Sequence, residues 1–295
     1  MPAHAFRITY KTEGKAMKKI GFIDYYLSEW HANNYPAWIK ENCQELGLDY
    51  KVAYAWAELD VSPRDNVTTD EWCAKFGAEK CESLEELCEK SDVLLMLCPS
   101  NPEKHLEYAK TALKYGKRIY IDKTFSPDYS EAYQIFEIAK HNGTPFFSSS
   151  ALRYGEELSK VASPVTMITT GGGRDIEEYI VHQCEMVVKK LGCDVKKVIA
   201  NVQGTQTFIN AHFESGNEAT MIFGGAMPFC VYMSDGQNDV WTGVNSPFFK
   251  ALIADIVKFY ETGDVSFDTE ETKAVMKLRE LAIKASEHPC CWFEA

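Results

Sequence analysis

The sequence of 295 residues lacks any apolar run that approaches the ~18 residues of a membrane-spanning helix. The N-terminus also lacks the apolar core of a secretory signal peptide. Positive charge is scarce as well, because 31 Lys and Arg face 43 Asp and Glu and leave a net charge of -12. Such a surface repels nucleic-acid phosphates and anionic lipids. We therefore expect a cytoplasmic protein with no nucleic acid and no membrane among its partners.

The ten cysteines lack the regular spacing of a disulfide framework, and a chain of this size does not need such cross-links. We therefore expect reduced thiols. Cys290 and Cys291 lie near His288, but no second Cys or His pair with zinc-finger spacing accompanies them. The sequence predicts no metal site.

Between residues 17 and 148, short apolar runs alternate with amphipathic stretches, which is typical of an α/β domain with a parallel sheet. Strands are expected at 18–23, 50–56, 92–98, 118–122 and 145–149, and helices at 34–46, 83–90, 103–115 and 128–141. In such a Rossmann-like sheet, the loops that follow the strands meet at one edge, where ligands bind. Residues 1–16 are polar and aperiodic, and we expect them to form a mobile extension.

The pattern changes in residues 149–295. A helix is expected at 176–191, then β-rich segments at 195–203, 205–214, 217–224 and 227–234, then helices at 247–262 and 270–286. Consecutive alternating strands joined by turns indicate an antiparallel sheet, and hence a second, α+β domain. The second face of this sheet would expose aromatic and aliphatic side chains, so we expect a homodimer or a homotetramer.

Two groups of residues have the character of a reaction site. The first group comprises a turn from Pro99 to His105, the pair Gly116-Lys117 at a helix end, and Asp122-Lys123-Thr124 at a strand end. The second group is on the expected helix 176–191, where Glu178, His182 and Glu185 have the spacing i, i+4 and i+7. This spacing puts the three side chains on one helical face.

These motifs, in this order, resemble those of the Gfo/Idh/MocA oxidoreductases, the group of glucose-fructose oxidoreductase and inositol dehydrogenase. In that family a strand ends in Glu-Lys-Pro, and a later helix carries Asp-x-x-x-His-x-x-Asp and ends in Gly. Here Lys123 is kept, Thr124 replaces the proline, and Glu178 replaces the first aspartate of the helix. The resemblance spans most of residues 17–286 and implies a Rossmann-like domain followed by a domain on an antiparallel sheet.

The resemblance also implies roles. Lys123 would place an ammonium group near the nicotinamide of NAD or NADP, His182 would be the general acid and base at a substrate hydroxyl, and Glu178 would stand for the family's aspartate. The expected contacts are Tyr26, Glu58, Pro99, Asn101, Asp122 and Lys123 for the cofactor, and Arg153 and Glu185 for the substrate.

The chemistry suits these residue types. Removal of a hydride from a secondary alcohol requires the hydroxyl proton to leave, and imidazole titrates near neutral pH. The competing interpretation is structural, because a His with Glu at i-4 is usually a solvated pair and a single Lys at a strand end is usually surface charge. For His31 we expect a surface or capping role.

One part of the family pattern is absent. The family's first turn reads Gly-x-Gly-x-x-Gly, because glycines let backbone N–H groups approach the pyrophosphate. Here the corresponding span, 24–29, has no glycine and contains Asp24 and Glu29. A carboxylate within ~5 Å of a pyrophosphate would cost on the order of 1–3 kcal/mol. Arg64, in an insertion after the second strand, is a candidate for meeting a phosphate instead.

The leading hypothesis is therefore a dehydrogenase that transfers a hydride between a nicotinamide cofactor and a sugar, cyclitol or related polyol. The alternative is a non-catalytic relative that serves as a binding or assembly protein without that cofactor. A third possibility is redox-neutral chemistry, such as lyase or hydrolase action, by Lys123 and His182.

Overall fold

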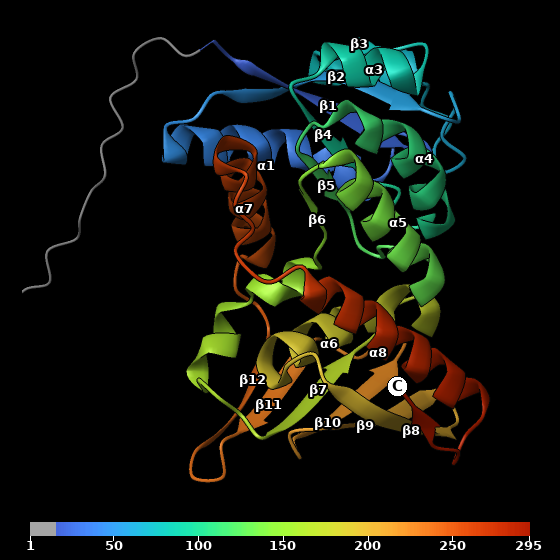
Figure 1. Cartoon of the computed structure of the whole chain (residues 1–295), viewed down its shortest axis with the longest axis vertical. Coiled ribbons are helices and arrows are strands. Elements are labelled where there is room, and N and C mark those ends of the chain that lie inside the picture. The colour runs from blue at the N-terminus through green and yellow to red at the C-terminus, as the bar shows by residue number, and fades with distance from the viewer. Residues whose placement is uncertain (1–15) are drawn as a thin grey trace, which may run out of the picture.

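The computed structural model describes residues 16–295. The expected mobile extension, residues 1–16, therefore lies outside the described residues except for its last member. Two sheets organise the described chain, and Figure 1 shows them one above the other. None of the helices in this part of the chain is long and apolar enough to cross a membrane.

The first sheet has six parallel strands in the order β3-β2-β1-β4-β5-β6. They are β1 (Lys18–Asp24), β2 (Tyr50–Ala57), β3 (Glu79–Lys80), β4 (Val93–Met96), β5 (Ile119–Ile121) and β6 (Phe146–Phe147). The strand order reverses between β1 and β4, and an open parallel sheet binds its ligand at this switch point. The expected Rossmann-like sheet is thus confirmed.

Helices cover both faces of the first sheet. They are α1 (Trp30–Leu46), α2 (Thr69–Phe76), α3 (Leu84–Lys90), α4 (His105–Ala112) and α5 (Tyr129–Asn142), with short 3₁₀ helices at Pro102–Lys104 and Leu113–Tyr115. Apolar side chains of α1 and α2 pack on one face, and those of α3, α4 and α5 pack on the other. Ser83 caps α3, because its hydroxyl accepts the Glu86 N–H.

The first helix begins earlier than expected. The sequence pattern predicted a helix over 34–46. Instead α1 begins at Trp30, and Pro36 lies inside it. The reason is the Glu29 side chain, which caps the helix by accepting the N–H groups of His31 and Ala32.

The second sheet has seven strands in the order β12-β11-β7-β10-β9-β8-β13. They are β7 (Thr166–Gly171), β8 (Val195–Gln203), β9 (Gln206–Phe213), β10 (Glu218–Gly224), β11 (Cys230–Ser234), β12 (Asp239–Gly243) and β13 (Phe293–Glu294). The expected antiparallel sheet is confirmed for most pairs, but β10 and β7 run parallel. The helix α6 (Ile176–Leu191) packs on one face of this sheet. Two 3₁₀ helices, Ala151–Tyr154 and Glu156–Lys160, precede β7 along the chain.

The two final helices join the sheets. The helix α7 (Phe248–Thr262) lies against α1 (Figure 1) and contributes to the core on that face of the first sheet. The Tyr260 hydroxyl donates to the Leu94 carbonyl at 2.6 Å. The helix α8 (Glu270–Glu287) packs on α6 and β8. The expected domain boundary at residue 148 stays a prediction. With that boundary, α7 belongs to the second domain by sequence but packs against the first sheet.

Candidate active site

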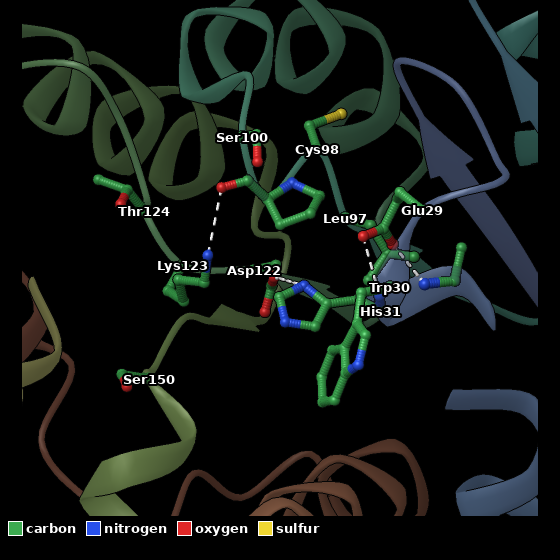
Figure 2. Close-up of polar contacts among 12 residues, drawn as sticks. Glu29, Trp30, His31, Leu97, Cys98, Ser100, Asp122, Lys123, Thr124 and Ser150 are labelled. Carbon is green, nitrogen blue, oxygen red and sulfur yellow. Dashed lines mark hydrogen bonds and ion pairs between the residues drawn. The ribbon is translucent and has the colours of Figure 1, made fainter. Parts of the chain in front are cut away.

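The candidate site lies at the carboxyl edge of the first sheet, where α6 of the second sheet approaches it. Asp24 ends β1, Pro99 and Ser100 follow β4, Asp122 and Lys123 follow β5. Figure 2 shows Ser100, Asp122 and Lys123 around one region of the edge. The parallel strands place them together although they are far apart in sequence.

Lys123 points toward the turn after β4. Its Nζ donates to the Pro99 carbonyl oxygen at 3.2 Å (Figure 2), and its side chain is partly exposed. The Lys123–Thr124 peptide bond is cis. One ammonium hydrogen bond to the protein leaves further donor positions for a ligand.

His182 projects from α6 toward the same edge. Its Nδ1 lies 2.7 Å from the Ser150 Oγ, and Ser150 follows β6 of the first sheet. Burial, the charge of Lys123 and the charge of His31 lower the pKa of His182 to about 3, against an opposing effect of Asp122. Lys123 and His182 are thus within electrostatic reach of each other, and the imidazole is neutral at physiological pH.

Glu178 lies one turn before His182 on α6 and bridges to the first sheet. Its carboxylate accepts the Ser100 hydroxyl at 2.7 Å and pairs with Arg174. These residues and Thr124 line a polar cleft of about 290 Å³ together with Arg279. The structure therefore places Glu178 at the junction of the two sheets, in contact with Ser100 and Arg174.

Asp122 is buried beside a histidine that we expected at the surface or as a cap. The Asp122 carboxylate lies 2.9 Å from His31 Nδ1 (Figure 2). It also accepts the Tyr120 hydroxyl at 3.0 Å. Burial opposes ionisation, but His31 and Lys123 outweigh it and hold the pKa of Asp122 below its ordinary value. The expectation for His31 was wrong, because its ring is buried and paired with Asp122.

Two more buried carboxylates stand where a glycine loop would expose N–H groups. Asp24 Oδ1 accepts the N–H groups of Tyr25 at 2.7 Å and Cys98 at 3.1 Å, and its Oδ2 has no hydrogen-bond partner in the described chain. Glu29 accepts the first N–H groups of α1 and is 4% exposed. Burial raises the pKa of Asp24 well above its ordinary value, and Glu29 raises it further.

The other expected cofactor contacts are engaged within the protein. Glu58 accepts Lys104 Nζ at 2.8 Å and the Tyr108 hydroxyl at 2.6 Å. Burial opposes ionisation of Glu58, yet these two hydrogen bonds lower its pKa. The Tyr26 hydroxyl hydrogen-bonds to Arg64, and the Asn101 amide donates to Glu103 at 3.0 Å.

The two expected substrate contacts lie together in the interior. Arg153 Nη1 pairs with Glu185 Oε1 at 2.9 Å, and Arg153 also pairs with Glu271. The guanidinium carbon lies 3.8 Å from the centre of the Phe267 ring. This geometry is that of a buried ion pair, so the two residues are positioned to hold α6 against the preceding 3₁₀ helix.

Sequence reasoning missed two residues of this site. Ser150, which orients His182, is the last of three consecutive serines after an expected strand, and its place at a strand end was the available signal. Glu29 is an uncommon capping residue, so no capping pattern marked it. Among residues 16–295, no group of three or more His, Cys, Asp or Glu is arranged to hold a metal ion.

This fold and this site define a class: two-domain proteins in which a Rossmann-type sheet presents its carboxyl edge to a second, mostly antiparallel sheet. Residues 58–149 match the sequence model of the oxidoreductase family with an NAD-binding Rossmann fold, GFO_IDH_MocA. These comparisons support the Gfo/Idh/MocA family for this chain, whose first turn lacks the glycines of that family.

Individual relatives agree with this assignment. An uncharacterized oxidoreductase of Escherichia coli K12, YhhX, is 36% identical over 66 residues, which cover 21% of this chain and 19% of that protein. The chain thus matches about a fifth of the length of this curated relative. GenD2 of gentamicin A biosynthesis, solved in complex with NAD, has a TM-score of 0.78 at 12% identity, with 98% of this chain and 99% of that chain covered.

A second solved structure has the same fold. The UDP-N-acetylglucosamine 3-dehydrogenase GnnA from Acidithiobacillus ferrooxidans has a TM-score of 0.73 at 12% identity, with 93% of this chain and 98% of that chain covered. At such low identity these two structures establish a common fold and leave the activity of this chain to its own residues.

Proposed function

We propose that the chain is a dehydrogenase that transfers a hydride between a nicotinamide cofactor, NAD or NADP, and a hydroxyl group of a sugar, cyclitol or related polyol. The observation that carries the proposal is the approach of His182 to Lys123 at the carboxyl edge of the first sheet. The match of residues 58–149 to the oxidoreductase family model supports the reaction class, and a small polyhydroxylated substrate suits a site lined by polar side chains.

The chain's own residues can handle the proton. With its pKa lowered to about 3, His182 is neutral at physiological pH and can accept the hydroxyl proton as the alcohol is oxidised, as a weaker base than an ordinary imidazole. Ser150 fixes the ring through Nδ1, and Nε2 has no partner within residues 16–295. The Lys123 ammonium supplies positive charge at which an alkoxide is stabilised. A bound nicotinamide would serve as the hydride donor or acceptor.

The residues present fit the two ends of a dinucleotide differently. Near the expected nicotinamide position, the Lys123 Nζ donates to the Pro99 carbonyl at 3.2 Å, which supports a place for the nicotinamide beside this ammonium group. At the position of the pyrophosphate, Asp24 and Glu29 already accept the hydrogen bonds of the backbone N–H groups. The pyrophosphate position therefore does not fit the usual mode of binding, and no step above depends on it.

A second candidate follows from this misfit. A relative that binds its ligand on the same scaffold without a dinucleotide would gain from carboxylates that satisfy the empty N–H groups. The capping of α1 by Glu29 is the observation that favours this candidate. It predicts a folded protein with no affinity for any nicotinamide form.

Calorimetric titration with NAD⁺, NADH, NADP⁺ and NADPH separates the two candidates. The dehydrogenase proposal expects one redox pair to bind, and expects its reduced form to accumulate when a panel of sugars, cyclitols and polyols is added. The Lys123→Met protein is the control, because it should bind polyols without turnover. Absence of binding and of turnover in the wild type would reject the dehydrogenase and favour the second candidate.

A further inference from the structure

The N-terminus of α1 is capped by a carboxyl group of the chain itself, that of Glu29. In Rossmann-type sheets the N-terminus of the first helix offers free N–H groups and a positive dipole end to a phosphate. Here the Glu29 carboxylate accepts the His31 N–H at 2.8 Å and the Ala32 N–H, and Figure 2 shows it turned onto the helix start. Glu29 thus makes the hydrogen bonds that phosphate oxygens make in such sheets.

The neighbouring N–H groups are satisfied in the same way. The two that follow β1 and β4, those of Tyr25 and Cys98, donate to Asp24 Oδ1 at 2.7 Å and 3.1 Å. Asp24 and Glu29 are both buried. A pyrophosphate at this edge would find few free donors and two carboxylates.

The turn that carries Glu29 is held in place by the insertion after β2. The Ser28 hydroxyl donates to Asp65 at 2.7 Å, and the Ser62 hydroxyl donates to the Ser28 carbonyl at 3.2 Å. Leu27, on the other side of the turn, is buried in the core of the first sheet. These contacts tie the turn to two segments, so the cap is part of the local fold.

We propose that Glu29 is a built-in substitute for the phosphate group, which closes the N-terminus of α1 to pyrophosphate esters. The inference rests on the family's binding mode that underlies the proposed function, and it deepens that function by naming the residue that limits cofactor affinity. A dinucleotide that binds the wild-type chain does so without hydrogen bonds from this helix. Removal of the Glu29 side chain reopens the helix start.

The test compares Glu29→Gly and Glu29→Gln with the wild type. Glycine is accepted at the first position of a helix and frees the N–H groups, whereas glutamine removes the charge but still caps. The probes are NADH, NADPH and ADP-ribose, which carry a pyrophosphate, and adenosine, which does not. We expect Glu29→Gly to bind the pyrophosphate-bearing probes at least ten-fold more tightly than the wild type, Glu29→Gln to gain less, and adenosine binding to stay unchanged.

Asp128→Gly is the matched control, because Asp128 caps α5 by accepting the Glu131 N–H at 2.8 Å. It should lower the melting temperature as Glu29→Gly does and leave probe binding unaltered. Equal affinity of wild type and Glu29→Gly, or no binding by any folded variant, would overturn the inference. If Glu29→Gly does not fold, Glu29→Gln decides. Tighter binding of the pyrophosphate-bearing probes by Glu29→Gln than by the wild type would support the inference, and equal binding would overturn it.

The outcomes also separate this inference from the proposed function. Tight NADH binding and turnover by the wild type, unchanged in Glu29→Gly, would sustain the dehydrogenase and reject the role of Glu29. Tighter NADH binding by Glu29→Gly, with no hydride transfer to or from any polyol, would sustain the role of Glu29 and reject the dehydrogenase.

Discussion

The Ser150 hydroxyl oxygen and His182 Nδ1 lie 2.7 Å apart, across the junction of the two sheets. Ser150 follows β6 of the first sheet, whereas His182 is on α6, which packs on the second. The contact therefore fixes the imidazole relative to the edge that carries Lys123. A shift of one sheet against the other would move the base away from the ammonium group.

Replacement of either proton-handling residue should abolish most of the activity. We expect Lys123→Met and His182→Ala each to reduce kcat/KM by ~100-fold or more, because each removes a group that acts on the proton or its charge. Because the pKa of His182 is lowered to about 3, the wild-type rate should also persist well below the ordinary histidine pKa of 6.5. Steady-state kinetics as a function of pH measures both effects.

His212→Ala is the control, because His212 lies on β9 of the second sheet, where it faces Glu218 at 3.6 Å. It should leave kcat/KM unchanged. Unaltered turnover in both site variants would end the mechanistic proposal, and a loss of rate centred on pH 6.5 that disappears in His182→Ala would contradict the lowered pKa.

Asp24→Asn should stabilise the protein at alkaline pH. Burial raises the pKa of Asp24, so the unfolded chain loses this proton above its ordinary pKa of 3.8 while the folded chain still holds it. Folding stability therefore falls as pH rises from 3.8 through the raised pKa. Asparagine removes the cost, and we expect a gain on the order of 1–3 kcal/mol at high pH.

Urea unfolding at several pH values checks this prediction, and the gain should shrink toward pH 3.8. Asp235→Asn is the control with the opposite sign, because backbone N–H groups of Asn238 and Gln237 lower the pKa of Asp235. Its carboxylate stabilises the fold above pH 3.8 and loses that effect as pH falls. Equal pH dependence of wild type and Asp24→Asn would contradict the assignment.

The sequence predicted the elements whose periodicity is strong. The bounds expected for the helix 176–191 and the strand 195–203 are those of α6 and β8. It missed β7, whose run Thr166–Gly171 is short and is stabilised by its neighbours β10 and β11. Strand pairing of this kind is decided by tertiary contacts, which a local pattern does not contain.

The same division holds for the site. Lys123 and His182 were predicted because the motifs that contain them resemble those of the Gfo/Idh/MocA family, and their places at a strand end and on a helical face agreed with that resemblance. The absence of glycines was visible, but the position of the Glu29 carboxylate on α1 depends on the turn that Ser62 and Asp65 hold in place. Ser150 was missed for a similar reason, because its partner is 32 residues away on another layer.

Breaking the buried pair of Arg153 and Glu185 should destabilise the fold. Removal of one partner leaves an uncompensated charge in the interior, which typically costs about 3–5 kcal/mol. We expect this loss for Arg153→Met, measured by urea unfolding, and a partial recovery in Arg153→Met/Glu185→Leu. Glu185→Gln should cost less than Arg153→Met, because Arg153 still pairs with Glu271. Lys250→Met, which breaks an exposed pair with Glu45, should cost less than about 1 kcal/mol. Losses as small as that control would contradict the prediction.

The outer face of the second sheet should form a contact between copies of the chain. Apolar side chains continue across it, because Phe208 is paired with Ile222, and Tyr232 is paired with both Ile168 and Trp241. Trp241 is 56% exposed in the single chain. A row of this kind is unusual on a surface that stays in water.

We expect a homodimer or homotetramer by light scattering at micromolar concentration, and dissociation when Ile222→Lys and Trp241→Lys are combined. Each lysine would place an ammonium group in the centre of the apolar contact, where its desolvation opposes association. Tyr133→Lys is the control, because Tyr133 is similarly exposed but lies on α5 of the first sheet. Circular dichroism would verify that the variants remain folded. A monomeric wild type, or a double variant that keeps the wild-type mass, would show that this face does not mediate assembly.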